Sequence, residues 1–97
     1  MNKVTVSLDT SSPLEIAPRF RFQWEEAQTS FVLLYPEGMI TLNQSASEIL
    51  KHCDGTSTAN GIIEKLKHTF PDADLESDVR EFLENAYAAG WIRTRHA

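Results

Sequence analysis

Residues 31–42 read FVLLYPEGMITL and form the centre of the predicted fold. The unbroken apolar run at residues 31–35 is typical of a strand that is covered on both faces. The next three residues, PEG, favour a tight connection, because proline fixes φ and glycine adopts turn conformations easily. Residues 39–42 are then the expected return strand, antiparallel to the first.

Another strand is predicted just before this hairpin, at residues 19–25, which read RFRFQWE. Polar and apolar side chains alternate strictly there, which places Phe20, Phe22 and Trp24 on one face. The three strands together predict a small antiparallel meander with residues 31–35 in its centre. The first and third strands are therefore edges of the sheet.

Two helices are predicted directly after the sheet. Asn43 is a good N-cap for the first, at about residues 44–53, and a glycine ends it two residues later. Ser57 or Thr58 caps the second, which Pro71 ends. Their apolar faces are expected at Ala46, Ile49, Leu50 and Cys53 in the first helix and at Ile62, Ile63, Leu66 and Phe70 in the second.

A third helix has the most regular apolar pattern in the chain. Asp74 is its expected N-cap and Gly90 its expected end. The apolar positions are Leu75, Val79, Phe82, Leu83, Ala86 and Tyr87. The expected fold class is α+β and winged-helix-like, with an N-terminal three-stranded antiparallel sheet followed by three helices.

The chain of 97 residues predicts one domain at residues 18–92. Residues 1–17 are expected to form a flexible N-terminal arm, since termini are poorly ordered unless tied down. Residues 93–97 are expected to form a short basic tail. A domain of this size buries about 60 to 70% of the surface that its unfolded chain exposes, which is enough for one core but too little for a large substrate cavity as well. A self-contained enzyme is therefore not expected.

The net charge of −5 argues against two classes of partner. Nucleic-acid phosphates and anionic membrane surfaces both repel a negative chain, so we expect no nucleic acid and no membrane, but proteins or peptides. No stretch approaches the roughly 20 apolar residues of a membrane span, and no signal peptide is recognisable. The single cysteine, Cys53, has no partner for an internal disulfide. We therefore expect a cytoplasmic protein that is a monomer or a weak dimer.

The side chains that most often carry chemistry are isolated from one another. His52, His68 and His96 have no partner at metal-ligand spacing. Cys53 lies on the apolar face of the predicted first helix, where a small buried hydrophobe is expected. The glycines are scattered and form no phosphate-binding loop. We predict no catalytic residue, no metal site and no cofactor.

A DNA-binding regulator is the alternative that a winged-helix order of elements raises. The third helix would enter the major groove in such a protein. From Asp74 to Ala89 it carries five carboxylates against the single cation Arg80, a net charge of −4. Phosphates repel such a helix, so the charge disfavours this alternative.

The return strand, Met39 to Leu42, is an edge without a guarding proline or lysine. A peptide that adds to such an edge is held by main-chain hydrogen bonds, while its side chains enter neighbouring pockets. The apolar arc of the third helix is about 140° wide, against the usual stripe of about 100°, and Leu83 and Tyr87 lie at one margin of it. The pattern leaves a second arrangement open, in which the third helix or the N-terminal arm covers this edge.

A series of short motifs resembles the PqqD family of pyrroloquinoline quinone (PQQ) biosynthesis. In chain order they are Leu34, Tyr35, Pro36, Glu37, Gly38 and Met39, then Leu42, Asn43, Ala46, Ile49 and Leu50, then Cys53, Asp54 and Gly55, then Asp78, Val79, Phe82 and Leu83, and last Gly90, Trp91 and Ile92. The resemblance covers about Pro18 to Ile92. It is most specific at the turn from Tyr35 to Met39 and at the helix end from Cys53 to Gly55.

The resemblance implies a peptide chaperone that is not an enzyme. Proteins of this family bind the precursor peptide PqqA and present it to the radical S-adenosylmethionine enzyme PqqE. Related recognition elements hold a leader peptide as an extra strand beside the third strand and against the third helix. Carried onto this chain, the peptide-binding residues are Met39, Ile40, Thr41 and Leu42 on the strand, and Val79, Phe82, Leu83, Ala86 and Tyr87 on the helix. The alternatives are a winged-helix DNA-binding regulator and a PqqE assembly subunit without a peptide site of its own.

Overall fold

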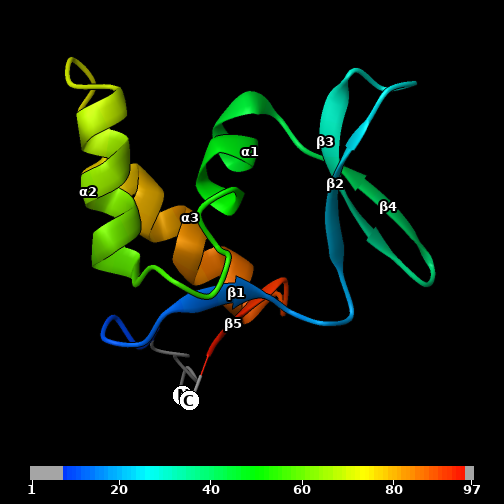
Figure 1. Ribbon diagram of the computed structural model, residues 1–97, viewed down its shortest axis with the longest axis horizontal. Coiled ribbons are helices and arrows are strands. Elements are labelled where there is room, and N and C mark those ends of the chain that lie inside the picture. Colours follow the sequence, from blue (N-terminus) through cyan, green and yellow to red (C-terminus); the bar gives the residue numbers. More distant parts are fainter. Residues whose placement is uncertain (1–7, 96–97) are drawn as a thin grey trace, which may run out of the picture.

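The computed structural model describes residues 8–95. In chain order its elements are β1 (Leu14–Ile16), β2 (Arg21–Glu25), β3 (Ser30–Tyr35), β4 (Gly38–Thr41), α1 (Gln44–Leu50), α2 (Ala59–Thr69), α3 (Glu76–Ala88) and β5 (Ile92–Thr94). Strands β2, β3 and β4 form one antiparallel sheet, and β1 and β5 form a second. Figure 1 shows the three helices on the left, the three-stranded sheet on the right, and the β1–β5 pair below the helices.

The predicted three-stranded meander is confirmed, with β3 in its centre. Phe22, Leu33 and Ile40 lie side by side across the three strands. Aromatic rings cover this face of the sheet: Phe31 stacks on Phe22 with ring centroids 4.8 Å apart and meets Trp24 edge to face at 5.2 Å. The face also carries the largest side chains of the sheet, as the alternation in the sequence predicts.

The first two helices begin where their caps predict. The Oδ1 atom of Asn43 accepts a hydrogen bond from the N–H of Ala46 at 2.8 Å, and the Oγ1 atom of Thr58 accepts one from the N–H of Gly61 at 3.1 Å. Each side chain satisfies a helix N–H that has no partner within the helix. Of the two predicted caps for α2, the structure therefore uses Thr58.

Two helix boundaries differ from the prediction. Helix α1 ends at Leu50 rather than near residue 53, because the carbonyl of Cys53 accepts a hydrogen bond from the N–H of Ile16 at 3.2 Å and so pairs with β1. Gly55 then turns the chain with φ +89°, a conformation that favours glycine.

The third helix begins later than predicted. It starts at Glu76, and the N-cap position is held by Leu75, whose apolar side chain makes no capping hydrogen bond. The predicted cap at Asp74 is therefore wrong. Phe70, which we expected on the buried face of the second helix, follows the end of α2 and is 39% exposed.

The prediction of a flexible N-terminal arm is wrong for Leu14–Ile16, which forms strand β1. Leu14–Ile16 pairs antiparallel with Ile92–Thr94 and also bonds to the loop after α1, where the N–H of Leu14 donates to the carbonyl of Ser57 at 2.9 Å. The Leu14 side chain is fully buried. Residues 1–7 of the expected arm lie outside the described residues.

The expected basic tail is likewise wrong for its first residues, because Arg93 and Thr94 belong to strand β5. The Nε atom of Arg93 donates a hydrogen bond to the Glu15 carboxylate at 2.6 Å, across the β1–β5 pair. Each strand has only three residues, which is too short for an alternating pattern to be recognised in the sequence. The strands are also 78 residues apart at this contact, so no local signal connects them. Residues 96–97 are outside the described part.

Sixteen apolar side chains are buried among the described residues, and all three helices contribute to them. Within residues 8–95, no helix is both long enough and apolar enough to cross a membrane. Over the same residues, no group of three or more His, Cys, Asp or Glu side chains is placed to hold a metal ion.

Candidate functional site

The outer edge of β4 carries free main-chain hydrogen-bonding groups. The N–H of Leu42 donates to the carbonyl of Phe31 at 3.0 Å, opposite which it lies in register. Because hydrogen-bonded and non-hydrogen-bonded pairs alternate in an antiparallel ladder, Ile40 is the next residue that bonds to β3. Met39 and Thr41 therefore turn their N–H and C=O groups away from β3, towards the open side of the sheet.

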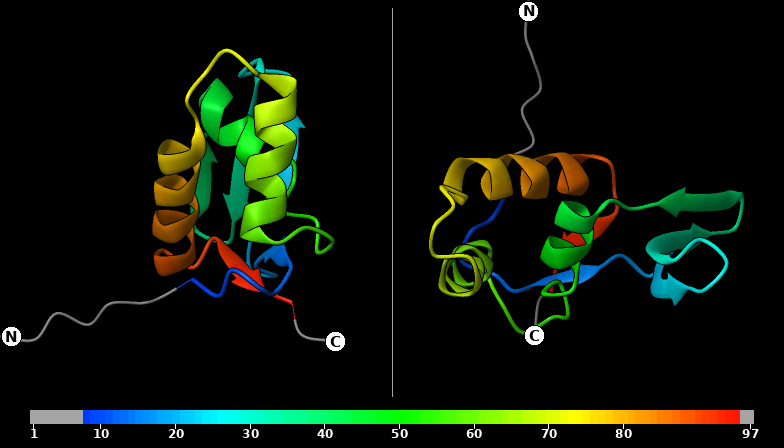
Figure 2. Two further views of the ribbon diagram at one scale, coloured as in Figure 1. Left: turned by 90° about the vertical axis from the view of Figure 1, so that its left-hand side faces the viewer. Right: turned by 90° about the horizontal axis from the view of Figure 1, so that it is seen from above.

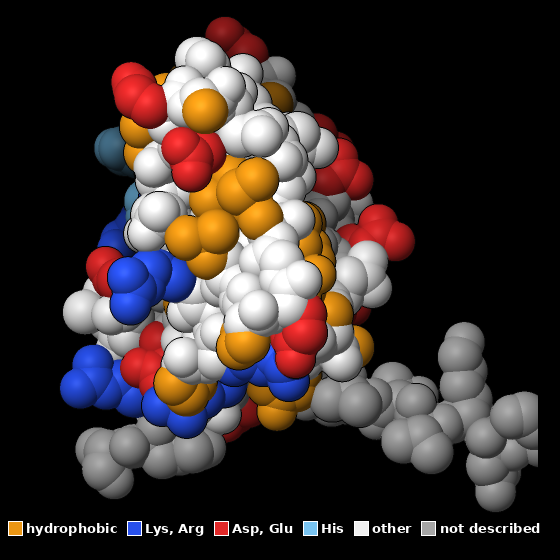
Figure 3. All heavy atoms as spheres, turned by 90° about the vertical axis from the view of Figure 1, so that its right-hand side faces the viewer, with side chains coloured by type: hydrophobic (Ala, Val, Ile, Leu, Met, Phe, Trp, Pro, Cys, Tyr) orange, Lys and Arg blue, Asp and Glu red, His pale blue; other side chains and the backbone are white. Residues whose placement is uncertain are grey.

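The side chains of β4 alternate between the two faces of the sheet. Ile40 is half-buried against the core, and Leu42, just after the strand, is only 5% exposed. Met39 and Thr41 point to the other face, where Met39 is 40% exposed. Figure 3, which views the molecule from its sheet side, shows apolar side chains gathered at the centre of that surface. Of the four predicted strand residues, Leu42 is thus part of the core.

A groove begins where β4 ends and runs between α1 and α3. Its volume is about 520 Å³, within the range typical of small-ligand pockets. It is lined by Asn43, Gln44, Ser45, Ala46, Glu48, Ile49, Leu66, Phe70, Ala73, Leu75, Asp78, Val79 and Phe82. The groove is larger than we expected for a chain of this length.

Strand β4 and helix α3 lie on the same side of the molecule. Figure 2 shows α3 and β4 along the same side of the molecule, with α1 between them. Asn43 lines the groove only two residues after Thr41, the last residue of β4, a step of about 7 Å along an extended chain. A strand that lies on the edge of β4 therefore reaches the groove by continuing for two residues.

The predicted residues of α3 divide into three groups. Phe82 lines the groove and is half-buried, whereas Val79 lies at the floor of the groove and is only 3% exposed. Leu83 is fully buried and Ala86 is 3% exposed, so both support the groove from beneath and neither is open to a ligand. Tyr87 lies about 140° around the helix from Phe82, at 100° per residue, and therefore belongs to the opposite flank.

Two of the predicted residues of α3, Leu83 and Tyr87, do not line the groove, which follows the other margin of the helix. Leu83 and Tyr87 were expected to border it, but their margin is the one that faces α2. Arg80, on that flank, donates to Asn60 of α2 at 3.4 Å. The contact with α2 occupies this flank, which the apolar pattern alone does not reveal because an apolar arc has two margins.

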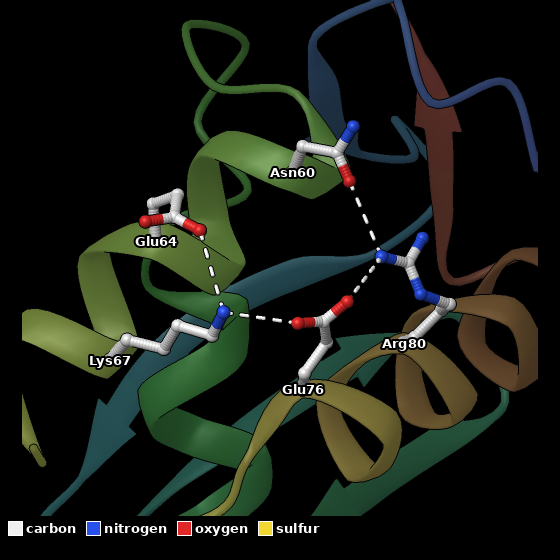
Figure 4. A network of polar contacts seen from close by, with 5 residues as sticks. All are labelled: Asn60, Glu64, Lys67, Glu76 and Arg80. Atoms are coloured by element: carbon white, nitrogen blue, oxygen red, sulfur yellow. Dashed lines mark hydrogen bonds and ion pairs between the residues drawn. The ribbon is translucent and has the colours of Figure 1, made fainter.

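Ion pairs fasten α3 to α2 and so support one wall of the groove (Figure 4). The Nζ atom of Lys67 lies 3.0 Å from one carboxylate oxygen of Glu76 and 3.6 Å from Glu64. Arg80 bonds to the other Glu76 oxygen at 3.3 Å. The hydrogen bond from Lys67 lowers the pKa of Glu76, and the same bond raises the pKa of Lys67.

The sequence pattern does not reveal the wall of the groove that α1 and the loop before α3 supply. Phe70 and Ala73 from this loop line the groove, together with polar residues at the start of α1. The one signal for Phe70 in the sequence is its position directly before Pro71, where a helix is expected to end. Phe70 was assigned to the core because it continues the spacing of the buried face of α2.

The groove holds no reactive group of unusual chemistry. Cys53 lies in the core, where burial, with a smaller effect from the charge of Asp54, raises the pKa of its thiol to about 12. A buried thiol of this kind is inert at neutral pH.

The exposed residues of α3 include Asp78, Glu81 and Glu84, so this helix presents carboxylates where a DNA-binding helix needs cations.

The chain matches one protein family and is similar to several of its members. The family model for coenzyme PQQ synthesis protein D (PqqD) matches residues 30–92. A "PqqA binding protein" of Methylococcus capsulatus is 49% identical over 88 residues, which cover 91% of this chain and 95% of that protein. A protein of the same name from Acinetobacter baylyi is 53% identical over 74 residues, 75% of each chain.

Solved structures have the same fold. The solution structure of the PqqD part of Methylobacterium extorquens PqqCD, described as a stand-alone recognition element for ribosomally synthesised and modified peptides, has a TM-score of 0.68 at 27% identity and covers 90% of this chain and 95% of that one. The heterocyclase TruD contains a similar fold, with a TM-score of 0.66 at 24% identity, covering 87% of this chain and 12% of TruD. With the family model and relatives at about half identity in agreement, the chain belongs to the PqqD family.

Proposed function

We propose that this protein is a peptide chaperone that binds the precursor peptide PqqA during PQQ biosynthesis. Its relatives from Methylococcus capsulatus and Acinetobacter baylyi are named as PqqA binding proteins. The observation that carries the proposal is the open edge of β4, which ends at the mouth of the groove between α1 and α3. The buried thiol of Cys53 fits a reducing compartment, so a cytoplasmic location is part of the proposal.

Strand addition is the proposed mode of binding. The main-chain groups of Met39 and Thr41 hydrogen-bond the peptide, which becomes a fourth strand of the sheet. Phe82 contacts the peptide where it passes the groove, and Val79 forms the floor beneath it. The remaining predicted residues, which are Ile40, Leu42, Leu83 and Ala86, shape the site from the core, and Tyr87 has no part in it.

The protein itself makes and breaks no bond in this proposal. It holds PqqA while it docks on the enzyme PqqE, so that the encounter of peptide and enzyme becomes intramolecular. The gain is an effective concentration set by the length of free peptide between the bound segment and the reacting residues. A binding site formed by an edge and a surface groove suits this task, because it leaves the rest of the peptide accessible.

Calorimetric titration of synthetic PqqA into the protein tests the proposal. We expect saturable binding of one peptide per chain, and none for a peptide of the same composition in scrambled order. No binding of PqqA to the free protein, together with formation of a complex with PqqE, would instead identify an assembly subunit without a peptide site. Retention of PqqA by a variant with a blocked β4 edge would refute strand addition.

A further inference from the structure

The charged side chains that line the groove are all of one sign. Among the described residues the lining includes the carboxylates of Glu48 and Asp78 and neither lysine nor arginine. Glu48 is neutralised by Lys51, whose Nζ atom lies 3.0 Å from its carboxylate. Asp78 has no hydrogen bond or ion pair with any residue of the described part. An unpaired negative charge therefore stands at the rim of a groove whose other polar side chains all come from α1 and the residue before it, while α2, α3 and the loop between them supply apolar side chains.

The neighbours of Asp78 on α3 strengthen this local charge. Glu81, one turn further along the helix, is also exposed and has no ion pair within residues 8–95. The cations of this region, Lys67 and Arg80, are engaged by Glu76 on the α2 side of the helix. The groove side of α3 is thus negative, while the α2 side is close to neutral.

The spacing of Asp78 and Phe82 matches that of an extended peptide. The two side chains lie one helical turn apart on the same margin of α3, a separation of about 5 to 6 Å between Cβ atoms. In a strand, side chains two residues apart lie on the same face about 7 Å apart. A peptide side chain in contact with Phe82 therefore places the side chain two residues away beside Asp78, within easy reach of a flexible Lys or Arg.

We infer that the groove selects a peptide segment with a bulky aliphatic or aromatic side chain against Phe82 and a Lys or Arg two residues away that pairs with Asp78. This inference rests on the proposed function and specifies the chemistry of the bound segment. Apolar contact supplies most of the affinity, and the charge pair sets the register and rejects segments with a carboxylate at that position.

A double-mutant cycle between protein and peptide tests the inference. The probes are synthetic PqqA and versions in which each Lys or Arg is changed to Gln one at a time, titrated by calorimetry at low salt. The protein variants are Asp78→Asn and the matched control Glu84→Gln, which removes the same charge from the same helix about 120° around it from Asp78. A third variant, Ala73→Phe, places a ring in the groove at an exposed loop position that contributes nothing to the buried core.

We expect Asp78→Asn to weaken PqqA binding by about two- to fivefold, the range of an exposed ion pair, and Glu84→Gln to leave it unchanged. One cation substitution in the peptide weakens binding to the wild type and has no further effect on Asp78→Asn. Ala73→Phe weakens all peptides by more than tenfold.

Three results would overturn the inference. Equal losses in Asp78→Asn and Glu84→Gln would show a general charge effect, and additive losses in every protein–peptide pair would show that no cation pairs with Asp78. Unchanged binding by a folded Ala73→Phe variant would place the peptide outside the groove. All three presuppose that the wild type binds PqqA, and the absence of that binding would refute the proposed function itself.

Discussion

The ring of Phe82 meets the indole of Trp91 edge to face, with ring centroids 6.5 Å apart. Phe82 lines the groove, and Trp91 directly precedes β5. The pair therefore connects the wall of the proposed site with an intrinsic fluorophore that lies outside it. We therefore expect a group that packs on Phe82 to change the surroundings of Trp91.

Fluorescence of Trp91 is expected to report peptide binding. In a Trp24→Phe variant, which leaves Trp91 as the single tryptophan, saturating PqqA shifts the emission because it excludes water from the Phe82 ring. The control is Trp91→Phe, which leaves only Trp24, 46% exposed on the far strand β2. A shift in the control but not in Trp24→Phe would place the peptide on the β2 edge.

Proline at Thr41 is expected to weaken PqqA binding by about two- to tenfold, the value of one main-chain hydrogen bond. The N–H of Thr41 faces the open edge of β4, so a proline at this position removes no hydrogen bond between β4 and β3. Calorimetry measures the affinity, and Thr41→Val, which keeps the N–H, is the matched control. Ile40→Pro breaks a bond to β3 and is expected to unfold the hairpin instead. Equal affinity of Thr41→Pro and Thr41→Val would contradict the role of this edge.

Truncation of Leu14 is expected to destabilise the whole domain. Leu14→Ala removes a fully buried side chain and should lower the free energy of unfolding by about 2 to 5 kcal/mol, measured by urea denaturation. Thr10→Ala, at an exposed position four residues earlier, should change it by less than about 0.5 kcal/mol. Similar small effects of both substitutions would contradict this prediction and indicate that the segment around Leu14 is only loosely held.

The Cys53 thiol is expected to be unreactive in the folded protein. Its pKa is raised from 9.0 to about 12, so the reactive thiolate is scarcer at pH 8 by about a thousandfold than in an unperturbed cysteine. A colorimetric disulfide reagent measures the rate. The same protein in concentrated urea serves as control and should react at the rate of a free thiol. A fast reaction in the native state would mean that the loop after α1 opens locally.

Stability on the acid side is expected to depend on Glu76. Because its pKa is lowered from 4.5, its ion pairs stabilise the fold above that pH, and the contribution is lost as the pH falls through the lowered value. In Lys67→Met the pKa of Glu76, followed by NMR of its carboxyl carbon, should rise towards 4.5. Lys51→Met, which breaks the separate pair with Glu48, should leave that titration unchanged.

Local patterns predicted most of the fold, because strands and helices of sufficient length repeat their buried positions. The strand at residues 31–35, the cap at Asn43 and the apolar face of α3 are examples. The β1–β5 pair was missed because its contacts are remote in sequence and its strands are short. The end of α1 was misplaced for the same reason, since pairing of Cys53 with Ile16 draws the chain out of the helix.

The site was predicted in part. The open edge of β4 followed from the order of the strands, whereas Val79 and Phe82 were named as site residues through the resemblance to the PqqD family. The apolar arc of α3 did not reveal which margin α2 would cover. The covered margin is set by the contacts of Glu76 and Arg80 with α2. The residues of one helix face do not by themselves show which neighbouring helix will pack against it.

The β1–β5 pair brings the two ends of the described chain together: the N–H of Arg95 donates to the carbonyl of Pro13 at 2.7 Å. A domain whose ends meet can be inserted into a loop of a larger protein at a single point, or circularly permuted, without disturbing the sheet on its other side. A similar fold covers 12% of the longer TruD chain. The two short strands β1 and β5 thus hold residues from both ends of the described domain next to each other, as such an insertion requires.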